Sequence, residues 1–589
     1  MSISSRSSCG LTRRRFVTGL GAGGLLGGLP ANAHTFTQPM GSLPATSSAN
    51  HNLRVGRTRI EIDGKCLDAP SVGGTVPGPI LRWKQGDTVS INVTNDLSES
   101  TSIHWHGIRV PSNMDGVPGL SFSGIAPGET FTYRFRLHQS GTYWYHGHSG
   151  MQEAQGLYGA IVIDPRTPDP TPCERDYVVL LSEWTDVDPM DILSNLKMQD
   201  DYYTFRQRTA ASFPREAKQA GSGIAALKDR LAWSKMRMSA TDISDVSGVI
   251  FSYLVNGHAP DTNWTGLFRP NERIRLRFIN ASTMTFFDIR IPGLEMQVVQ
   301  ADGNDVEPIS VDEFRIGVAE TYDVIVQPKD ERAYTIFAQS EDRTGYARGT
   351  LAPHSGMSAA IPPMDPRPVR TMIDMGMSHM KPNDSMGRMN RAGDMSGMQM
   401  SGMSMKGMGG MKMPPLKRDD PGPPPLNVEN QNVAMMPVDR TGSPGDGLEN
   451  TGRRVLNYRQ LRATRPGADM RPPSHEIIMH LTGNMERYIW GFNGRKFSEA
   501  GPIRLKLGER VRFILINDTM MEHPIHLHGL WSELENGQGA YQPYKHTIIS
   551  QPGSKLSYLV TADTPGMWAY HCHLMYHMDS GMFRTVIVS

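Results

Sequence analysis

Four short clusters hold the residues in this sequence of 589 that are best suited to chemistry. Together they contain ten histidines, one cysteine and one methionine. The clusters are His104-Trp105-His106, His146-Gly147-His148, His523-Pro524-Ile525-His526-Leu527-His528, and His571-Cys572-His573 followed by His577 and Met582. Imidazole, thiolate and thioether ligands suit copper, and one cysteine with two histidines and a weak axial methionine is the blue-copper set. The clusters therefore predict copper sites for redox chemistry.

Other uses of histidine and cysteine fit these clusters less well. A closed structural zinc site takes four ligands and would leave most of these histidines without a purpose. Haem attachment needs a Cys-x-x-Cys-His run, which the chain lacks. A single His-x-His pair is also compatible with surface or hydrogen-bonded histidines, so the prediction depends on the recurrence of such clusters around one cysteine.

Strand geometry indicates how the last cluster would work. Side chains alternate between the two faces of a strand, so we expect Cys572 to point one way and His571 and His573 the other. One strand could then bind one copper through its cysteine and a second copper cluster through the flanking histidines. A His-x-His pair likewise places both imidazoles on one face.

The clusters lie in repeated segments. From about residue 53 to 164, short alternating runs broken by Gly, Pro and Asn-Asp predict a β-sandwich. His104 and His526 each come nine residues after the first residue of an Asn-Asp pair, and His146 and His571 each follow a glycine by five residues. Residues 272–280 match 509–517 in pattern without a following His-x-His. We therefore expect three sandwiches, with the middle one a spacer or wall that carries a partly helical insertion at about 184–245.

Between about residues 351 and 453 the pattern changes to Pro, Gly, Ser and Met. We expect a flexible linker or loop here. Soft thioethers prefer Cu(I), and core packing does not explain such a density of methionine, so we predict capture of cuprous ion; a linker without ligands is the alternative. Fourteen methionines fall within 42 residues: Met372, Met375, Met377, Met380, Met386, Met389, Met395, Met398, Met400, Met403, Met405, Met408, Met411 and Met413.

The first 33 residues resemble a twin-arginine export signal. Arg13-Arg14-Arg15 precedes a weakly apolar stretch and a small-x-small cleavage site that ends at Ala33. The apolar stretch is too short to span a membrane, so we predict export without a transmembrane segment. The signal carries four arginines and no acid; without it, 56 basic residues face 59 acidic ones, which disfavours a nucleic-acid partner.

With these motifs, the sequence resembles the multicopper oxidases, which are all-β proteins of three cupredoxin-like Greek-key sandwiches. The signal, Asp201-Tyr202-Tyr203, residues 263–268 and the Met-rich insert most resemble the bacterial periplasmic copper-resistance protein A group. The resemblance implies a signal at 1–33, domain 1 at 50–165, domain 2 without copper ligands at 166–350, a disordered Met-rich insert within a linker at 351–453, and domain 3 at 454–589.

The resemblance also implies four copper ions. The type 1 ion would bind His523, Cys572, His577 and Met582, and the type 2 ion His104 and His526. The type 3 pair would bind His106, His146, His148, His528, His571 and His573.

The resemblance leaves two proton-delivery questions open. Asp115 matches an acid near the trinuclear cluster, although the pair Asp115-Gly116 is also a common turn. Many bacterial members of the family have a second acid directly after the last type 1 histidine, where this chain has Met578 and then Asp579.

The leading hypothesis is a periplasmic, monomeric oxidase. It would receive electrons from Cu(I), and from phenols, at the type 1 copper through Cys572 and reduce dioxygen to water, serving copper tolerance. A general laccase and a copper-sequestering protein are the alternatives; a copper nitrite reductase would not need the full ligand set. Cys66 and Cys173 could pair or stay as thiols.

Overall fold

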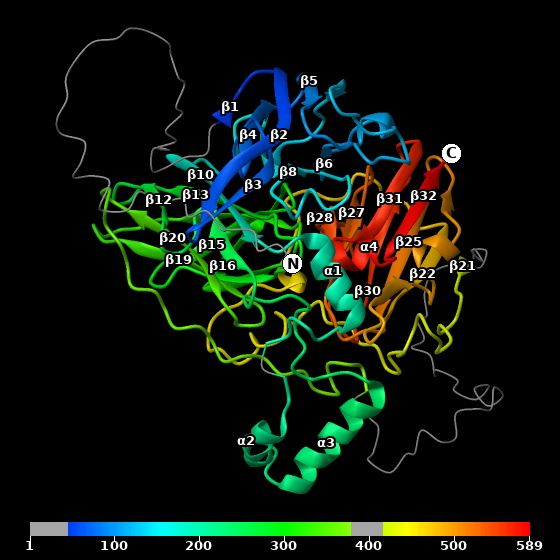
Figure 1. Cartoon of the computed structure of the whole chain (residues 1–589). Coiled ribbons are helices and arrows are strands. Elements are labelled where there is room, and N and C mark those ends of the chain that lie inside the picture. Colours follow the sequence, from blue (N-terminus) through cyan, green and yellow to red (C-terminus); the bar gives the residue numbers. More distant parts are fainter. Residues whose placement is uncertain (1–44, 206, 378–415) are drawn as a thin grey trace, which may run out of the picture.

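Strands dominate the fold of this chain. The computed structural model describes residues 45–205, 207–377 and 416–589, in which six sheets form three pairs (Figure 1). The first pair lies at the top of the view, the middle pair at the left and the last pair at the right. The arrangement confirms the all-β prediction of three sandwiches. The signal at 1–33 lies outside the described residues.

The first sandwich buries one apolar core between a five-stranded and a four-stranded sheet. The burial of β5 alternates along the strand, as its sequence pattern predicts. The sheets run, in spatial order, β1 (Ala45–Thr46), β4 (Gly78–Lys84), β9 (Tyr158–Asp164), β8 (Gly141–His146), β6 (His104–His106); and β3 (Lys65–Val72), β2 (Asn50–Ile62), β5 (Thr88–Asn95), β7 (Thr130–Arg136).

The middle sandwich pairs a six-stranded with a five-stranded sheet. The sheets run β11 (Ser252–Val255), β10 (Arg175–Trp184), β13 (Ile274–Asn280), β18 (Thr321–Val326), β15 (Met296–Ala301), β16 (Asn304–Val311); and β12 (Trp264–Leu267), β20 (Tyr346–Ala352), β19 (Tyr334–Ser340), β14 (Phe287–Arg290), β17 (Glu313–Ile316).

The last sandwich carries the cysteine strand, β31. Its first sheet runs β21 (Lys417–Asp419), β22 (His475–Asn484), β25 (Arg510–Asn517), β30 (Lys555–Thr561), β27 (Ser532–Leu534), β28 (Tyr544–Lys545), with β23 (Ile489–Phe492) also on β22. The second runs β24 (Ile503–Leu505), β32 (Phe583–Val588), β31 (Gly566–Cys572), β26 (His523–Leu527), β29 (Thr547–Ser550).

The three sandwiches share one local design, which confirms the repeat. In each, one strand (β5, β13, β25) pairs in parallel with an earlier strand and antiparallel with a later one. That strand ends in an asparagine, Asn95, Asn280 or Asn517. Each asparagine side chain accepts the N–H two residues on and donates to two carbonyl groups, fixing the turn that follows. In the first and last copies the chain after this turn leads into the His-x-His strands β6 and β26.

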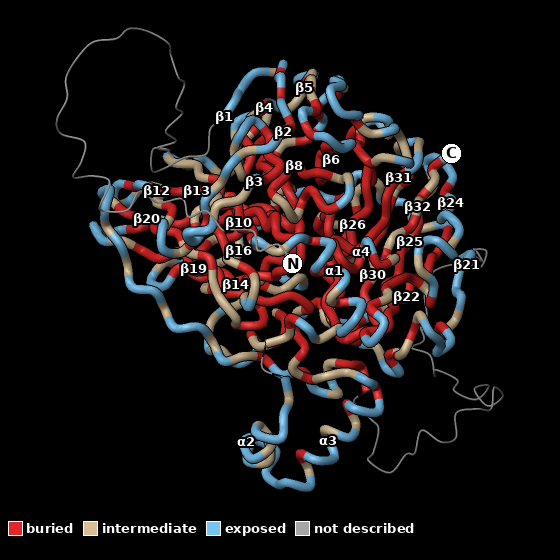
Figure 2. The backbone as a smooth tube through the Cα atoms, viewed as in Figure 1, coloured by how far each residue is buried: buried red, intermediate tan, exposed pale blue. Residues whose placement is uncertain are grey.

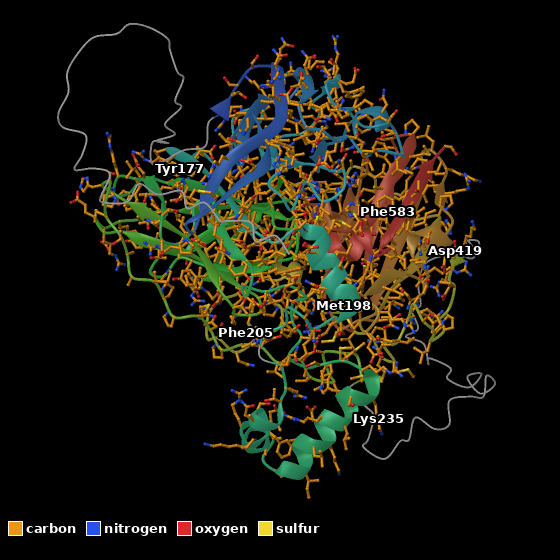
Figure 3. All side chains as sticks on the ribbon, viewed as in Figure 1. Tyr177, Met198, Phe205, Lys235, Asp419 and Phe583 are labelled. Carbon is orange, nitrogen blue, oxygen red and sulfur yellow. The ribbon has the colours of Figure 1, made fainter. Side chains whose placement is uncertain are left out.

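Four α-helices lie in the described residues: α1 (Pro189–Met198), α2 (Phe213–Gln219), α3 (Gly223–Met236) and α4 (Met575–Asp579). The first three fall between β10 and β11, so the expected partly helical insertion is present. Figures 1 and 3 show α2 and α3 projecting from the main body, and Lys235 labelled near the end of α3. The described residues include no helix that is both long and apolar enough to cross a bilayer.

The stretch predicted as a flexible linker is packed where the structure describes it. Residues 353–377 and 420–453 form no helix or strand, yet the Arg370 side chain is fully buried and donates to Asp446 at 3.2 Å. Met375 and Met377 are buried in the large apolar core to which residues of all three sandwiches contribute. Core packing therefore accounts for these two methionines, contrary to the sequence-based expectation, whereas the eleven from Met380 to Met413 lie outside the described residues.

Candidate metal centres

Cys572 is fully buried and is the last residue of β31. Figure 2 shows the tube around β31 largely in the colour of buried residues. The Sγ of Cys572 lies 3.5 Å from Nδ1 of His523 on β26 and 3.8 Å from Nδ1 of His577 on α4. The two Nδ1 atoms are 3.3 Å apart. All three side chains are fully buried, and Met582 is fully buried in the same core. The structure thus brings together the predicted cysteine and its two histidines, with the predicted methionine close by in the chain.

The histidines on either side of Cys572 point away from it, as strand alternation predicts. His571 comes within 4.8 Å of His148 and His528, measured between ligand atoms, and His573 forms a second such triad with His106 and His146. His104 and His526 remain, and both also lie within this distance of His106. Two triads and one pair therefore use the eight histidines that were predicted to form a cluster.

The histidine cluster is assembled from two sandwiches. Its residues from the first sandwich lie on or directly after β6 and β8, and those from the last on or directly after β26 and β31. The rings interleave: His106 stacks on His526 with centroids 3.8 Å apart, and His104 lies 4.0 Å from His528. Neither sandwich alone holds a complete set.

The chemistry of the cluster fits metal ions. Among the described residues, Nε2 of five of these histidines and Nδ1 of His106 are buried without a hydrogen-bond partner: His104, His146, His148, His526 and His573 supply the five. Such orphaned ring nitrogens are costly in a core unless a ligand satisfies them. Burial, reinforced by neighbouring histidines, holds the pKa of His106, His146 and His148 well below the usual value. These rings are therefore neutral near pH 7, the form that binds metals.

The cysteine site also suits a metal. Burial raises the pKa of the Cys572 thiol, so a thiolate forms readily only when a bound cation replaces the proton. Thr519 Oγ1 lies 2.7 Å from Nε2 of His523, which leaves Nδ1 directed at Cys572. This arrangement matches the soft N and S donors that copper takes.

Two carboxylates of the first sandwich contact the histidine cluster. Asp115 Oδ2 lies 2.9 Å from Nδ1 of His528, and the Asp115 carbonyl lies 2.8 Å from Nδ1 of His104. Asp115 is therefore at the cluster, the position that the resemblance implies for it. Glu153, which that reasoning missed, has Oε2 2.8 Å from Nδ1 of His146. Burial and the nearby Glu183 raise the pKa of Glu153 well above its usual value.

The middle sandwich contributes more than a wall. Asp245, which follows the insertion's helices, accepts a hydrogen bond from Nε2 of His577 at 2.7 Å and another from the Tyr488 hydroxyl at 2.7 Å. Trp490 stacks on His577 with centroids 3.8 Å apart. The outer edge of His577 is therefore covered by protein. The sequence offered no signal for this contact, because the two partners are 332 residues apart.

A second acid of the middle sandwich, Asp302, is linked to the histidine cluster by hydrogen bonds through the backbone of His546. Asp302 is fully buried and accepts the N–H groups of His546 and Thr547, each at 3.1 Å. The His546 carbonyl in turn lies 2.6 Å from Nδ1 of His526. His546 is a further buried histidine at the cluster, with Nδ1 3.2 Å from Nε2 of His106, and sequence reasoning did not select it.

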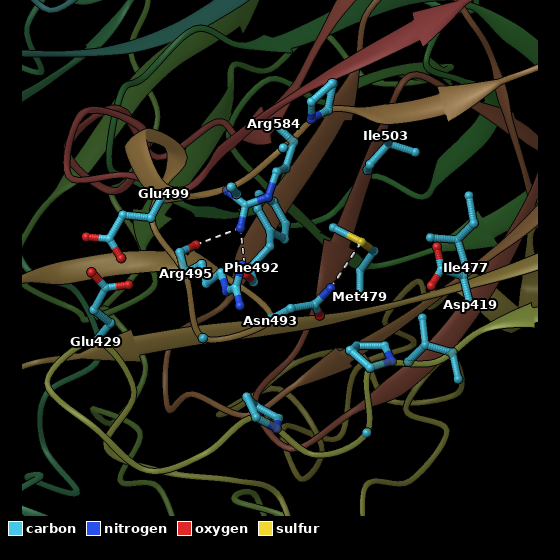
Figure 4. A pocket seen from close by; sticks show the side chains of 18 of the residues that line it. Asp419, Glu429, Ile477, Met479, Phe492, Asn493, Arg495, Glu499, Ile503 and Arg584 are labelled. Atoms are coloured by element: carbon cyan, nitrogen blue, oxygen red, sulfur yellow. Dashed lines mark hydrogen bonds between the residues drawn. The ribbon is translucent and has the colours of Figure 1, made fainter.

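Other predicted residues lie elsewhere. Asp579 is exposed at the end of α4, so it does not lie among the buried histidines, and Met578 is half-buried. No disulfide joins Cys66 to Cys173 in the described part of the chain. A cavity of about 930 Å³ in the last sandwich is lined by none of the predicted ligands. Figure 4 shows it around Phe492 and Arg584, whose guanidinium donates to the carbonyls of Phe492 and Arg495.

Comparison with known proteins decides the family. Models of the multicopper oxidase family match residues 54–168, 175–356 and 470–589. The chain belongs to the multicopper oxidases. It is 52% identical over 609 residues to Copper resistance protein A of Escherichia coli, covering 98% of this chain and 99% of that protein. It is 50% identical over 613 residues to Copper resistance protein A of Pseudomonas syringae pv. tomato, with the same coverage.

Solved structures of this family share the fold. The laccase from Botrytis aclada has a TM-score of 0.60 at 20% identity, covering 93% of this chain and 88% of that chain. A multicopper oxidase from Campylobacter jejuni has a TM-score of 0.54 at 20% identity, covering 93% and 96%. As a multicopper oxidase, this chain is a copper-dependent oxidoreductase.

Acid should destabilise the copper-free oxidase. Burial lowers the pKa of His546 and of His571 to about 4, below the value of about 6.5 in an unfolded chain. Between these values the unfolded chain binds protons that the folded chain does not, so stability is complete above about pH 6.5 and is lost as pH falls toward 4. Thermal unfolding of the copper-free protein should show a midpoint that drops across this range; a constant or rising midpoint would contradict the prediction.

Proposed function

We propose that this chain is an exported bacterial oxidase that oxidises Cu(I) with dioxygen and thereby serves copper tolerance. One observation carries the proposal: β31 presents Cys572 to one group of ligands and His571 and His573 to another. A sequestering protein would need the donors but not a cysteine held directly between two histidine triads.

The ligand assignment follows the geometric groups. His523, Cys572, His577 and Met582 would hold the type 1 copper, and His104 and His526 the type 2 copper. The triads His106–His146–His573 and His148–His528–His571 would hold the type 3 pair. Four copper ions at these positions would supply one-electron uptake at the cysteine and four-electron reduction of dioxygen to water at the cluster.

The protein supplies a short path between the two sites. From Cys572 Sγ, a few covalent bonds lead through the backbone to either flanking imidazole. Nδ1 of His571 also lies 2.9 Å from the Cys572 carbonyl, so a hydrogen bond offers a parallel route to one triad. Asp115 lies against that triad and is our candidate for proton delivery.

The environment of His577 favours a small reductant. Its ring is fully buried, and its outer nitrogen is hydrogen-bonded to Asp245, so a bulky phenol has no direct contact with it. Electrons would reach His577 through Asp245 and the residues around it. Two relatives similar over nearly the full length are named copper resistance proteins, which agrees with cuprous ion as substrate. We infer that phenols are slower substrates.

We further propose capture of Cu(I) by the thioethers of the Met-rich segment, and export by the twin-arginine machinery to the periplasm as a monomer. The bacterial source of both relatives supports the compartment. The nearly balanced charge of the chain gives no reason to expect a nucleic-acid partner.

Oxygen uptake with a Cu(I) complex as sole reductant tests the proposal. We expect uptake by the copper-loaded chain and a several-fold slower uptake when residues 378–415 are deleted, because cuprous ion would lose its thioether ligands. The deletion spares Met375 and Met377, which are core residues. Phenol-supported uptake should not fall.

A full-length variant with the eleven methionines of this segment changed to leucine separates thioether chemistry from segment length. If it behaves as the deletion does, the sulfur atoms matter. If no form consumes oxygen with Cu(I) while a phenol supports all of them, the laccase alternative replaces this proposal. Copper binding without turnover of any reductant would instead support sequestration.

A further inference from the structure

Glu153 lies in the turn between β8 and β9, seven residues after His146, and is 4% exposed. Its carboxylate reaches two members of one triad. Oε2 is 2.8 Å from Nδ1 of His146, and Oε1 is 3.9 Å from Nδ1 of His573. These are the ring edges that face away from the centre of the triad, because Nε2 of both rings is buried there without a partner.

The charge of this carboxylate has no ordinary counter-ion. Among the described residues, its ion-pair contacts within 4 Å are the two histidines, and no lysine or arginine is among them. Oε1 is buried without a hydrogen-bond partner. A buried acid of this kind is costly unless a positive charge lies close to it.

A metal ion in the triad would supply that charge. Bound cations are often the largest local charges in a site, and a carboxylate behind a histidine ligand orients the ring and increases its basicity. The Nδ1 of His146 already lies 3.0 Å from the Gly147 carbonyl, so the ring is held with Nε2 toward the triad. The Gly147 carbonyl already fixes the orientation of the His146 ring, and Glu153 adds a negative charge beside the Nδ1 edge of that ring.

The second triad has a matching carboxylate. Asp115 lies 2.9 Å from Nδ1 of His528, again on the edge away from the triad. Each triad thus has one acid of the first sandwich behind one of its histidines. The role of Glu153 could not be predicted from the sequence, because nothing in Met151-Gln152-Glu153-Ala154 indicates that the glutamate is buried against a histidine.

We propose that Glu153 is a positioning residue for the copper held by His106, His146 and His573. It stabilises the ion through its negative charge at the outer edges of His146 and His573. The inference rests on the ligand assignment proposed above, and it concerns one copper of the type 3 pair.

Glu153→Gln and Glu153→Leu test this inference. Glutamine keeps the size and an oxygen beside His146 but removes the charge, whereas leucine removes both. We expect the affinity for one of the four copper ions, measured by competition with a chelator, to fall by about 10- to 100-fold with leucine and less with glutamine. Two Cu(II) ions held in neighbouring triads would couple magnetically, so loss of one should unmask an electron paramagnetic resonance signal from the other. The blue absorption of the Cys572 site should stay constant.

Asp342→Asn is the matched control. Asp342 is also buried, but its hydrogen bonds in the described residues come from Ser340 and Thr344 rather than from a histidine of the cluster. The control should lower stability without changing copper affinity or the resonance signal. Unchanged copper affinity in both Glu153 variants, or the same copper loss in Asp342→Asn, would overturn the inference. If the unaltered protein itself binds no copper at the histidines, the proposed function fails instead.

Discussion

Cys572→Ser should abolish oxidase activity and leave the fold in place. The Cys572 side chain is fully buried, and serine is nearly isosteric, so packing in the last sandwich is retained. A hydroxyl is a poor ligand for copper compared with a thiolate, and the path from His523 and His577 to β31 loses its sulfur atom. Changes to residues behind metal ligands cost about 10- to 100-fold, so loss of this ligand should cost more than about 100-fold in oxygen uptake.

Three measurements on Cys572→Ser distinguish loss of the copper ligand from loss of the fold. The blue absorption should vanish, copper content should fall by one ion from the four that we propose, and far-ultraviolet circular dichroism should not change. Cys173→Ser is the control, because Cys173 is a half-buried thiol outside the metal groups, and it should leave all three measurements unchanged. Substantial oxygen uptake by Cys572→Ser would remove the cysteine from the electron path.

Local sequence rules predicted much of the candidate site. Alternation along β31 predicted that Cys572 and its neighbours would serve opposite sides, because side-chain direction on a strand depends only on position. The repeated Asn-Asp and His-x-His spacing predicted equivalent strands in the first and last sandwiches. Both inferences needed only residues close together in the chain, and both agree with the geometry.

The groups that surround the ligands were beyond sequence reasoning. Asp245 contacts His577 and Asp302 contacts the backbone of His546 only because the middle sandwich docks beside the last one. Such contacts depend on how the sandwiches dock, and no periodicity encodes docking. Met375 and Met377 were misjudged for the same reason, since the surrounding sequence has the composition of a loop while their burial comes from the large apolar core that they join.

The three sandwiches therefore contribute different residues to the candidate metal centres. The first and last supply the histidines, and the middle one supplies carboxylates that cover His577 and support His526 through His546. The middle sandwich supplies none of the predicted ligands, yet its carboxylates contact His577 and the backbone of His546. Mutations at its interface with the last sandwich should consequently affect copper binding as well as folding.

Asp115→Asn should slow oxygen reduction without slowing electron uptake. The Asp115 side chain is 1% exposed, its Oδ2 lies 2.9 Å from Nδ1 of His528, and its Oδ1 is buried without a partner. An asparagine keeps the shape and an oxygen for His528 but cannot take up and release a proton. General acid–base groups contribute about 10²- to 10⁴-fold, so steady-state oxygen uptake should fall by about 100-fold or more.

The same variant decides between proton delivery and a turn-forming role. Asparagine forms turns as well as aspartate does, so a residue needed only for the turn would tolerate the change. The tight turn depends on Gly116 instead: its φ is +85°, and an added Cβ would collide with the Ile103 carbonyl. Bleaching of the blue absorption by Cu(I) without oxygen should proceed at the normal rate in Asp115→Asn, whereas its return on adding oxygen should be slow. Copper content should be measured in the same samples and should be unchanged, because Asp115 lies behind His528 as Glu153 lies behind His146, and loss of copper would also slow the return. A normal rate of return would mean that Asp115 serves the turn.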